Sequence, residues 1–170
     1  MDRKFLHWLT GLRSKPMNRI MIFITHLGTG GMVWLLFSLV FFIQGQKTLS
    51  YRVLLALVVN GLICNLTLKP LLKRSRPSWI DKIDLLIKNP TDFSFPSGHA
   101  SSSFAAATTI FFQNQGLGTL CLVLAGLIAF SRLYHFVHYP SDVVLGSLLG
   151  IAMAHLSRFI FNNYLLFLIG

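Results

Sequence analysis

Long apolar stretches dominate the chain, and short polar segments that carry most of the charged residues separate them. A helix that crosses a membrane needs ~20 mostly apolar residues. The stretches Ile20–Gln46, Val53–Leu72 and Ser141–Ile160 each reach this length. Pro140 directly precedes the last stretch and suits the first turn of a helix. The pattern therefore predicts one membrane-spanning helix in each of the three stretches.

The stretch Phe93–Ser131 has no formal charge and is too long for one membrane-spanning helix. As a single helix it would measure ~58 Å at about 1.5 Å per residue, against a hydrocarbon core of ~30 Å. The polar sequence Gln113–Gly116 is typical of a turn. We therefore expect two helices, near Gly98–Phe112 and Leu117–Phe136, and five spans in all.

Two polar segments complete a predicted single domain over residues 1–170. Residues 1–19 contain the sequence Phe5–Leu12 between basic residues, which predicts an interfacial amphipathic helix with Trp8 as its membrane anchor. Residues 73–96 are the one long polar loop.

Glycines within 28–31 interrupt the first span, so its first third is expected to be a separate helical piece. The predicted fold is an all-α, integral-membrane helical bundle with about five transmembrane helices and an N-terminal interfacial helix.

The composition supports a membrane protein with an anionic partner. Hydrophobic residues make up 54% of the chain and charged residues 12%, whereas a soluble domain is about 25% charged. The net charge of +10, on so apolar a chain, favours anionic lipid head groups or a phosphate-bearing substrate over nucleic acid. Both cysteines lie in apolar runs, which excludes a cysteine-based zinc site.

Residues capable of chemistry gather where the predicted helices end on one face of the membrane. The second and fourth spans end on the face where the third and fifth begin, because consecutive spans run in opposite directions. These helix ends carry seven such residues, Lys69, Arg76, Ser97, His99, Arg132, His138 and Asp142.

The basic residues of this set suit the binding of a phosphate. Lys69, Arg76 and Arg132 supply three cations, and the planar fork of arginine matches phosphate oxygens two at a time. Ser97 and Gly98 open a helix, where a hydroxyl and free backbone N–H groups face an incoming anion.

The remaining residues suit acid–base or nucleophilic chemistry. His138 and Asp142 are four residues apart and would share one face of a helical turn. A carboxylate bonded to one imidazole nitrogen leaves the other nitrogen free as a nucleophile or base. His99 is a second, separate imidazole that suits a general acid. The whole set describes phosphoryl transfer without a metal.

Each feature also has a simpler explanation when it is taken alone. Basic residues between 69 and 76 are typical of charges beside a membrane, and Ser97 is typical of a helix cap. His138 and Asp142 could form a purely structural hydrogen bond.

Several other polar residues are expected to have no role in the site. Asp81, Asp84 and Asp92 lie in the long loop, where their spacing does not indicate a metal site and solvated charges are expected. His135 has no partner at a useful spacing and is expected at the membrane interface, whereas His26 precedes the glycine break and a role in the site stays open.

The chain resembles the type 2 phosphatidic acid phosphatase (PAP2) superfamily in three motifs. The family signature is Lys-x6-Arg-Pro, then Pro-Ser-Gly-His, then Ser-Arg-x5-His-x3-Asp. This chain has KPLLKRSRP at 69–77, PSGH at 96–99 and SRLYHFVHYPSD at 131–142, all complete and in order. The resemblance covers about residues 20–157. Many bacterial members have six spans, whereas the pattern here predicts five.

The resemblance implies a role for each site residue. His138 would be the nucleophile that forms a phosphohistidine, Asp142 would orient it, and His99 would protonate the leaving group. The phosphate would be held by five residues, Lys69, Arg76, Ser97, Gly98 and Arg132. The family needs no metal and no cofactor.

The implied activity is the hydrolysis of a lipid phosphate or diphosphate such as undecaprenyl diphosphate, phosphatidylglycerol phosphate or phosphatidate. The implied partners are the lipid substrate and the bilayer, with no nucleic acid and no obligatory protein partner. Two alternatives stay open: a lipid phosphotransferase that uses the same site, and a non-enzymatic membrane carrier or scaffold.

The side of the membrane on which the site lies is indicated by two conflicting arguments. All 15 Lys and Arg residues except Lys47, Arg52 and Arg158 fall on the active-site face, and the positive-inside rule alone would place that face in the cytoplasm. Several of these cations are expected to take part in catalysis, however, and related bacterial lipid phosphatases usually act on the outer face. We therefore expect a site on the outer face of the cell membrane.

Overall fold

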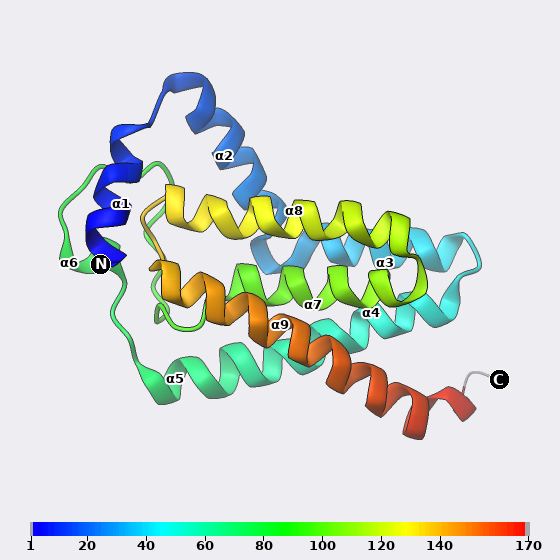
Figure 1. Cartoon of the computed structure of the whole chain (residues 1–170). Helices are drawn as coiled ribbons and strands as arrows, with labels where there is room; N and C mark the ends of the chain where they lie inside the picture. Colours follow the sequence, from blue (N-terminus) through cyan, green and yellow to red (C-terminus); the bar gives the residue numbers. More distant parts are fainter. Residues whose placement is uncertain (1, 169–170) are drawn as a thin grey trace.

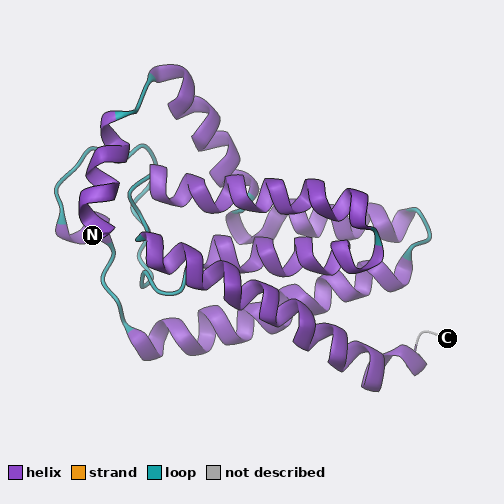
Figure 2. Ribbon diagram, in the orientation of Figure 1, coloured by secondary structure: helices purple, strands orange, loops and turns teal. Residues whose placement is uncertain are grey.

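The computed structural model describes residues 2–168, and all regular structure within this range is helical (Figure 2). Three long helices, α7 (Gly98–Gln113), α8 (Gln115–Tyr134) and α9 (Pro140–Ile160), follow one another in alternating directions (Figure 1). The short helices η3 (Phe161–Leu165) and η4 (Leu166–Leu168) extend α9. The all-α bundle confirms the predicted fold class.

The apolar helices only partly account for the five predicted spans. Three stretches are long and apolar enough to cross a membrane, Lys47–Ile80, Gln115–Tyr134 and Pro140–Leu165. A fourth is possible if the bent pair Lys15–Leu27 and Thr29–Ile43 forms one span. Helix α7 has 16 residues, fewer than the ~20 that a spanning helix needs. The number five therefore stays a prediction.

The first apolar stretch is broken where the glycines predicted a break. Helices α2 (Lys15–Leu27) and α3 (Met32–Ile43) are joined by η1 (Thr29–Gly31) and bent by 52°. Gly30 and Gly31 have φ angles of 60° and 71°, a region that glycine enters without steric cost. The prediction that the stretch begins as a separate helical piece is confirmed.

The second apolar stretch changes its helical form before it reaches the polar end. Helix α4 (Lys47–Asn60) continues as the π-helix η2 (Gly61–Leu68) and then as α5 (Lys69–Leu72). π-Helical turns are rare and occur frequently at functional sites. Here the change of pitch directly precedes Lys69.

The middle of the bundle is α7, which contacts α4, α8 and α9. Its buried residues are mostly Ala, Ser and Thr, and such small side chains let neighbouring helices approach closely in membrane bundles. Larger side chains fill the rest of the core, including Ile110 of α7 itself and Trp34, Phe41 and Ile128 of the surrounding helices. The central helix that carries the Pro-Ser-Gly-His motif is thus fixed on several sides.

The N-terminal helix α1 (Asp2–Gly11) has the amphipathic character predicted for it. Leu6 and Leu9 are buried in apolar clusters with residues of the α8–α9 connection and of α8. Trp8 leaves 59% of its surface exposed on the other face. Arg3 pairs with Asp81, which ties α1 to the long loop. The exposed aromatic face supports the predicted contact with the membrane interface.

All the helix ends that the topology predicted to meet lie at one end of the bundle (Figure 1). The end of α5, the start of α7, the end of α8 and the start of α9 face the loop that contains the short helix α6 (Pro77–Ile80). This loop and α1 cover the end of the bundle.

Candidate active site

A cavity of about 440 Å³ opens at this end of the bundle. Five of the eight residues predicted for the site line it, Lys69, Arg76, His99, Arg132 and His138. The other three, Ser97, Gly98 and Asp142, lie at the helix starts around it. Most of these side chains are nearly fully buried, including the cations Arg76 and Arg132. The structure therefore gathers the residues of all three motifs.

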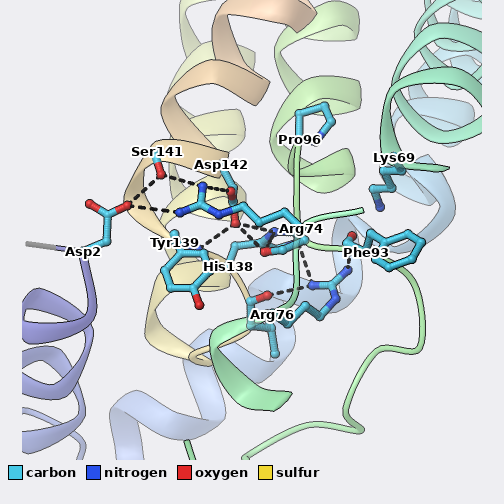
Figure 3. A network of polar contacts seen from close by, with 12 residues as sticks. Asp2, Lys69, Arg74, Arg76, Phe93, Pro96, His138, Tyr139, Ser141 and Asp142 are labelled. Atoms are coloured by element: carbon cyan, nitrogen blue, oxygen red, sulfur yellow. Dashed lines mark hydrogen bonds and ion pairs between the residues drawn. The ribbon is translucent and has the colours of Figure 1, made fainter. Parts of the chain in front are cut away.

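Arg76 is held by backbone carbonyls and aimed at His138 (Figure 3). Its Nε donates to the carbonyl of Asp92 at 2.7 Å, and its Nη1 donates to the carbonyl of Val137 at 2.7 Å. The same Nη1 lies 3.0 Å from Nε2 of His138. A guanidinium has only donors, so Nε2 must accept this hydrogen bond.

The predicted pair of His138 and Asp142 is present, but its two groups do not touch directly. Nδ1 of His138 lies 3.6 Å from Oδ2 of Asp142, beyond hydrogen-bond distance. The hydroxyl of Ser94 donates to the same Oδ2 and lies 3.4 Å from Nδ1. A serine thus stands between the imidazole and the carboxylate.

Asp142 is completely buried at the first turn of α9 and is held by several donors. Arg74 donates from Nη1 to Oδ1 at 2.6 Å, and the backbone N–H of Tyr139 donates to Oδ2 at 2.9 Å. The guanidinium of Arg74 also lies over the ring of Tyr139, 4.2 Å from its centroid. A buried carboxylate needs such partners, and they fix its orientation.

Two buried polar groups, one at the start of α7 and one on a residue that lines the cavity, have no hydrogen-bond partner among the described residues. They are the hydroxyl of Ser97 and Nε of Arg132. Arg132 uses Nη1 to donate to the hydroxyl of Thr25 at 2.5 Å. Buried polar groups normally find hydrogen bonds, so these two atoms indicate a place for an anion with several acceptor oxygens.

Asp92 is not the solvated loop charge that the sequence analysis expected. Its carboxylate pairs with both Lys69 and Arg76, at 2.8 Å in the second case. The expectation was wrong because the loop folds back over the helix ends and brings Asp92 to the cations. Partial burial opposes ionisation, but the hydrogen bond and charge of Lys69, together with Arg76, lower the pKa of Asp92 to about 2.

Two glycines allow close approach of the site's elements. A Cβ at Gly98 would lie 2.8 Å from Oδ1 of Asn65 and 3.4 Å from Nζ of Lys69. A Cβ at Gly28 would lie 2.9 Å from the ring of His99. The glycine break after α2 therefore packs directly against the predicted general acid, whose Nε2 is 3.5 Å from the hydroxyl of Thr29.

The electrostatic environment keeps His138 neutral. Burial lowers its pKa well below the usual value, and the neighbouring cations Arg76, Arg132 and Lys69 lower it further. Since Nε2 accepts from Arg76, the proton of the neutral ring belongs on Nδ1, on the side of Ser94 and Asp142. The Nε2 lone pair faces the cations.

His135 is fully buried rather than interfacial, which corrects the sequence-based expectation. The residues after α8 turn back into the protein, and the adjacent Phe136 packs against Leu6 of α1. Burial accordingly lowers the pKa of His135 to about 4. The residues beside His135 include Met21 and His26 of α2, and local spacing could not indicate this approach of a helix that is distant in sequence.

Sequence reasoning did not single out Ser94, and it grouped Arg74 with simple membrane-side charges. The one available signal was position: Ser94 lies two residues before Pro96 of the second motif, and Arg74 lies inside the first motif, two residues before Arg76. His26 lines the cavity together with Thr29. Among residues 2–168, no group of three or more His, Cys, Asp or Glu side chains is placed to hold a metal ion.

Comparison with known proteins places these motifs in a family. The sequence profile of the PAP2 superfamily matches residues 49–165. The undecaprenyl-diphosphatase BcrC of Bacillus subtilis is 30% identical over 147 residues, which cover 85% of this chain and 74% of that protein. The lipid A 4'-phosphatase of Bacteroides thetaiotaomicron is 29% identical over 88% of this chain and 72% of its own length.

A solved structure shares the fold. The crystal structure of a transmembrane PAP2-type phosphatidylglycerolphosphate phosphatase from Bacillus subtilis superposes with a TM-score of 0.78 at 23% identity, covering 96% of this chain and 85% of that one. The profile match, the identity to BcrC and this shared fold together show that the chain is a multi-pass membrane phosphatase. The chain belongs to the PAP2 superfamily.

Proposed function

We propose that this protein hydrolyses a phosphate or diphosphate ester of a membrane lipid through a phosphohistidine on His138. The observation that carries the proposal is the contact between Nη1 of Arg76, which can only donate, and Nε2 of His138, in a buried cluster of cations beside unpartnered polar atoms. A neutral imidazole with its lone pair aimed at a phosphate site is a ready nucleophile.

In the first step, the N–H of Arg76 turns from Nε2 of His138 to a phosphate oxygen. The freed lone pair of Nε2 attacks phosphorus, and a nitrogen–phosphorus bond forms. The bond between phosphorus and the leaving oxygen breaks, and His99 gives that oxygen its proton. The positive charge that develops on the imidazole is offset by the buried carboxylate of Asp142 beyond Nδ1. The lipid or lipid phosphate then departs.

In the second step, water attacks the phosphohistidine. His99, now unprotonated, takes a proton from the water, and the nitrogen–phosphorus bond breaks to release inorganic phosphate. His99 therefore acts as the acid in the first step and as the base in the second, and both histidines return to their starting protonation states.

The charge on the transferred phosphoryl group is balanced by fixed donors. Lys69, Arg76 and Arg132 surround the cavity, and the hydroxyl of Ser97 and the start of α7 at Gly98 complete the cradle. Donors that are already in place before reaction stabilise a transition state more than mobile ones do. These five residues are our proposed phosphate-binding set.

A lipid substrate suits the location of the site. The cavity lies at one end of a bundle of apolar helices, where the phosphate of a lipid can reach the cations while its tail stays among membrane-exposed side chains. The related proteins carry the names of enzymes for undecaprenyl diphosphate and lipid A. We propose the same substrate class here, in a single domain over residues 1–170 whose active-site face is the outer one.

The test is a phosphate-release panel with purified protein in EDTA. The panel compares undecaprenyl diphosphate, phosphatidylglycerol phosphate, phosphatidate and lipid A, with a short soluble phosphate ester as the reference. We expect at least one lipid to exceed the soluble ester in kcat/KM, because binding of the tail helps to position the phosphate. Release of phosphate from lipid and water alone favours hydrolysis over phosphotransfer. Equal efficiency on the soluble ester would contradict a lipid phosphatase.

A further inference from the structure

The imidazole of His138 has no direct hydrogen bond to the carboxylate that is expected to orient it. Nδ1 and the nearer oxygen of Asp142 are 3.6 Å apart, whereas Nδ1 and the hydroxyl of Ser94 are 3.4 Å apart. The hydroxyl itself donates to that same carboxylate oxygen. Its lone pairs are therefore free to accept the Nδ1 proton.

Asp142 cannot easily swing toward the imidazole, because its other contacts hold it. Arg74 binds Oδ1, and the backbone N–H of Tyr139 binds Oδ2 (Figure 3). Arg74 is in turn connected to Ser141, whose hydroxyl receives a hydrogen bond from Nη1 at 2.8 Å. The carboxylate is thus fixed at the distance at which a hydroxyl bridges it to His138.

The backbone of Ser94 places the hydroxyl independently of the side-chain hydrogen bond. Its N–H donates to the carbonyl of Arg74 at 2.8 Å, and the residue is completely buried. The segment would keep its position without the hydroxyl. A bridge to His138 is therefore a separate role of this side chain.

We propose that Ser94 is a positioning residue that links Asp142 to His138 and holds the imidazole with Nε2 toward the phosphate site. This inference rests on the proposed nucleophilic role of His138. The hydroxyl of Ser94 accepts a hydrogen bond from Nδ1–H of His138 and donates its own hydrogen to Asp142, so it couples the buried carboxylate to the ring and fixes the tautomer that Arg76 also requires. It touches neither phosphorus nor the leaving group.

The first measurement compares Ser94→Ala with wild type in steady-state phosphate release from the lipid that the panel selects. We expect kcat to fall about 10- to 100-fold, the range for a lost hydrogen bond to a charged group, with KM changed less than about threefold. Ser157→Ala is the matched control, since Ser157 is also a buried serine, in α9, and bonds only to the carbonyl of Ala154. Wild-type kcat in Ser94→Ala would overturn the proposal.

The second measurement is a double-mutant cycle with Asp142→Asn. If Ser94 acts through Asp142, the double variant will be about as slow as Asp142→Asn alone, because both changes break the same link. Independent, multiplicative losses would overturn the proposal. Thermal unfolding in detergent checks the fold, and Ser94→Cys replaces Ser94→Ala in both measurements if the alanine variant unfolds.

The experiments distinguish failure of the proposed function from failure of the positioning role of Ser94. If wild type and Ser157→Ala release no phosphate, or if His138→Ala stays active, the nucleophilic role of His138 is wrong and the positioning role falls with it. If those controls behave as expected and only the Ser94 variants keep wild-type rates, the positioning role alone is wrong.

Discussion

Nη1 of Arg76 lies 3.0 Å from Nε2 of His138, and this contact determines which ring nitrogen carries the proton. Arginine can only donate, so Nε2 holds a lone pair and Nδ1 holds the hydrogen. One residue of the first motif thus sets the tautomer of His138, the proposed nucleophile in the third motif. The same guanidinium also donates to the carbonyls of Asp92 and Val137, which fixes the plane of its fork.

Arg76→Lys is expected to lower kcat/KM about 100-fold or more although it keeps the charge. A lysine ammonium cannot bridge the two carbonyls, the imidazole and a phosphate at once, and removal of one fixed donor to a developing charge typically costs 10²–10³ in rate. Phosphate release is the measurement. Arg158→Lys, at the far end of the bundle, is the control and should stay within about twofold of wild type. A similar small loss for Arg76→Lys would contradict the assigned role.

Asp92→Asn is expected to strengthen inhibition by vanadate or inorganic phosphate. Asp92 pairs with Lys69 and Arg76 in the structure, so an incoming phosphate must compete with its carboxylate. The carboxylate is about half exposed, and each such pair is weak, so we expect the inhibition constant to fall about fivefold. Asp84→Asn in the same loop is the control. An unchanged inhibition constant in Asp92→Asn would show that Asp92 does not compete for the site.

The ion pairs of Asp92 with Lys69 and Arg76 make the stability of the folded protein depend on pH. The folded pKa of Asp92, about 2, lies below the ordinary value of 3.8, so the ionised form is favoured in the folded protein. Its stabilising contribution is complete above about pH 4 and is lost as the pH falls through about 2. The difference in unfolding temperature between wild type and Asp92→Asn should therefore shrink over this range.

The sequence predicted the helix ends well because simple rules place them. The turn near Gln113–Gly116 and the start of α9 at Pro140 follow from the lengths of apolar runs and from turn and proline chemistry. The gathering of the three motifs follows from the alternating direction of the helices. The number of spans was less predictable, since α7 is short and the first stretch bends at η1.

The contacts of Asp92 and Ser94 could not be predicted, because both residues lie in the irregular segment between α6 and α7. No hydrophobic period describes such a segment, and its path depends on tertiary contacts such as the backbone bond from Ser94 to Arg74. The burial of His135 depends in the same way on residues distant in sequence, because Met21 and His26 of α2 lie beside it. Local spacing identified which residues could react, and the tertiary path decided which residues assist them.

Gly28→Ala is expected to reduce activity through His99. The new methyl group would lie 2.9 Å from the imidazole and 2.5 Å from Cγ2 of Ile128, so the ring must shift from its place beside the cavity. We expect kcat to fall about tenfold or more, since small displacements of a catalytic group cost much of the rate. Gly126→Ala is the control, because nothing lies within 4 Å of its added Cβ. Equal rates in the two variants would show that the turn at Gly28 does not position His99.

The outward orientation of the site is tested by Asn89→Cys. Asn89 is exposed in the active-site loop, and both natural cysteines are buried. We expect a membrane-impermeant thiol reagent to label Asn89→Cys in intact cells. Gln44→Cys, exposed at the α3–α4 turn on the opposite end, should be labelled only after the cells are opened. The reverse pattern would place the active site in the cytoplasm, as the basic residues taken alone suggest.

The two-step mechanism is tested by separating its two histidines. With a phosphate substrate whose leaving group is already acidic, such as a nitrophenyl ester, His99→Ala should still form phosphoenzyme, because that leaving group needs no proton to depart. It should then accumulate the intermediate, because no base takes the proton of the attacking water. His138→Ala should form none with any substrate, since it lacks Nε2. Acid-labile radioactive phosphate on the denatured protein is the measurement, and Asp142→Asn should show slow labelling with an intact fold. Label on His138→Ala at the wild-type level would mean that another residue is the nucleophile.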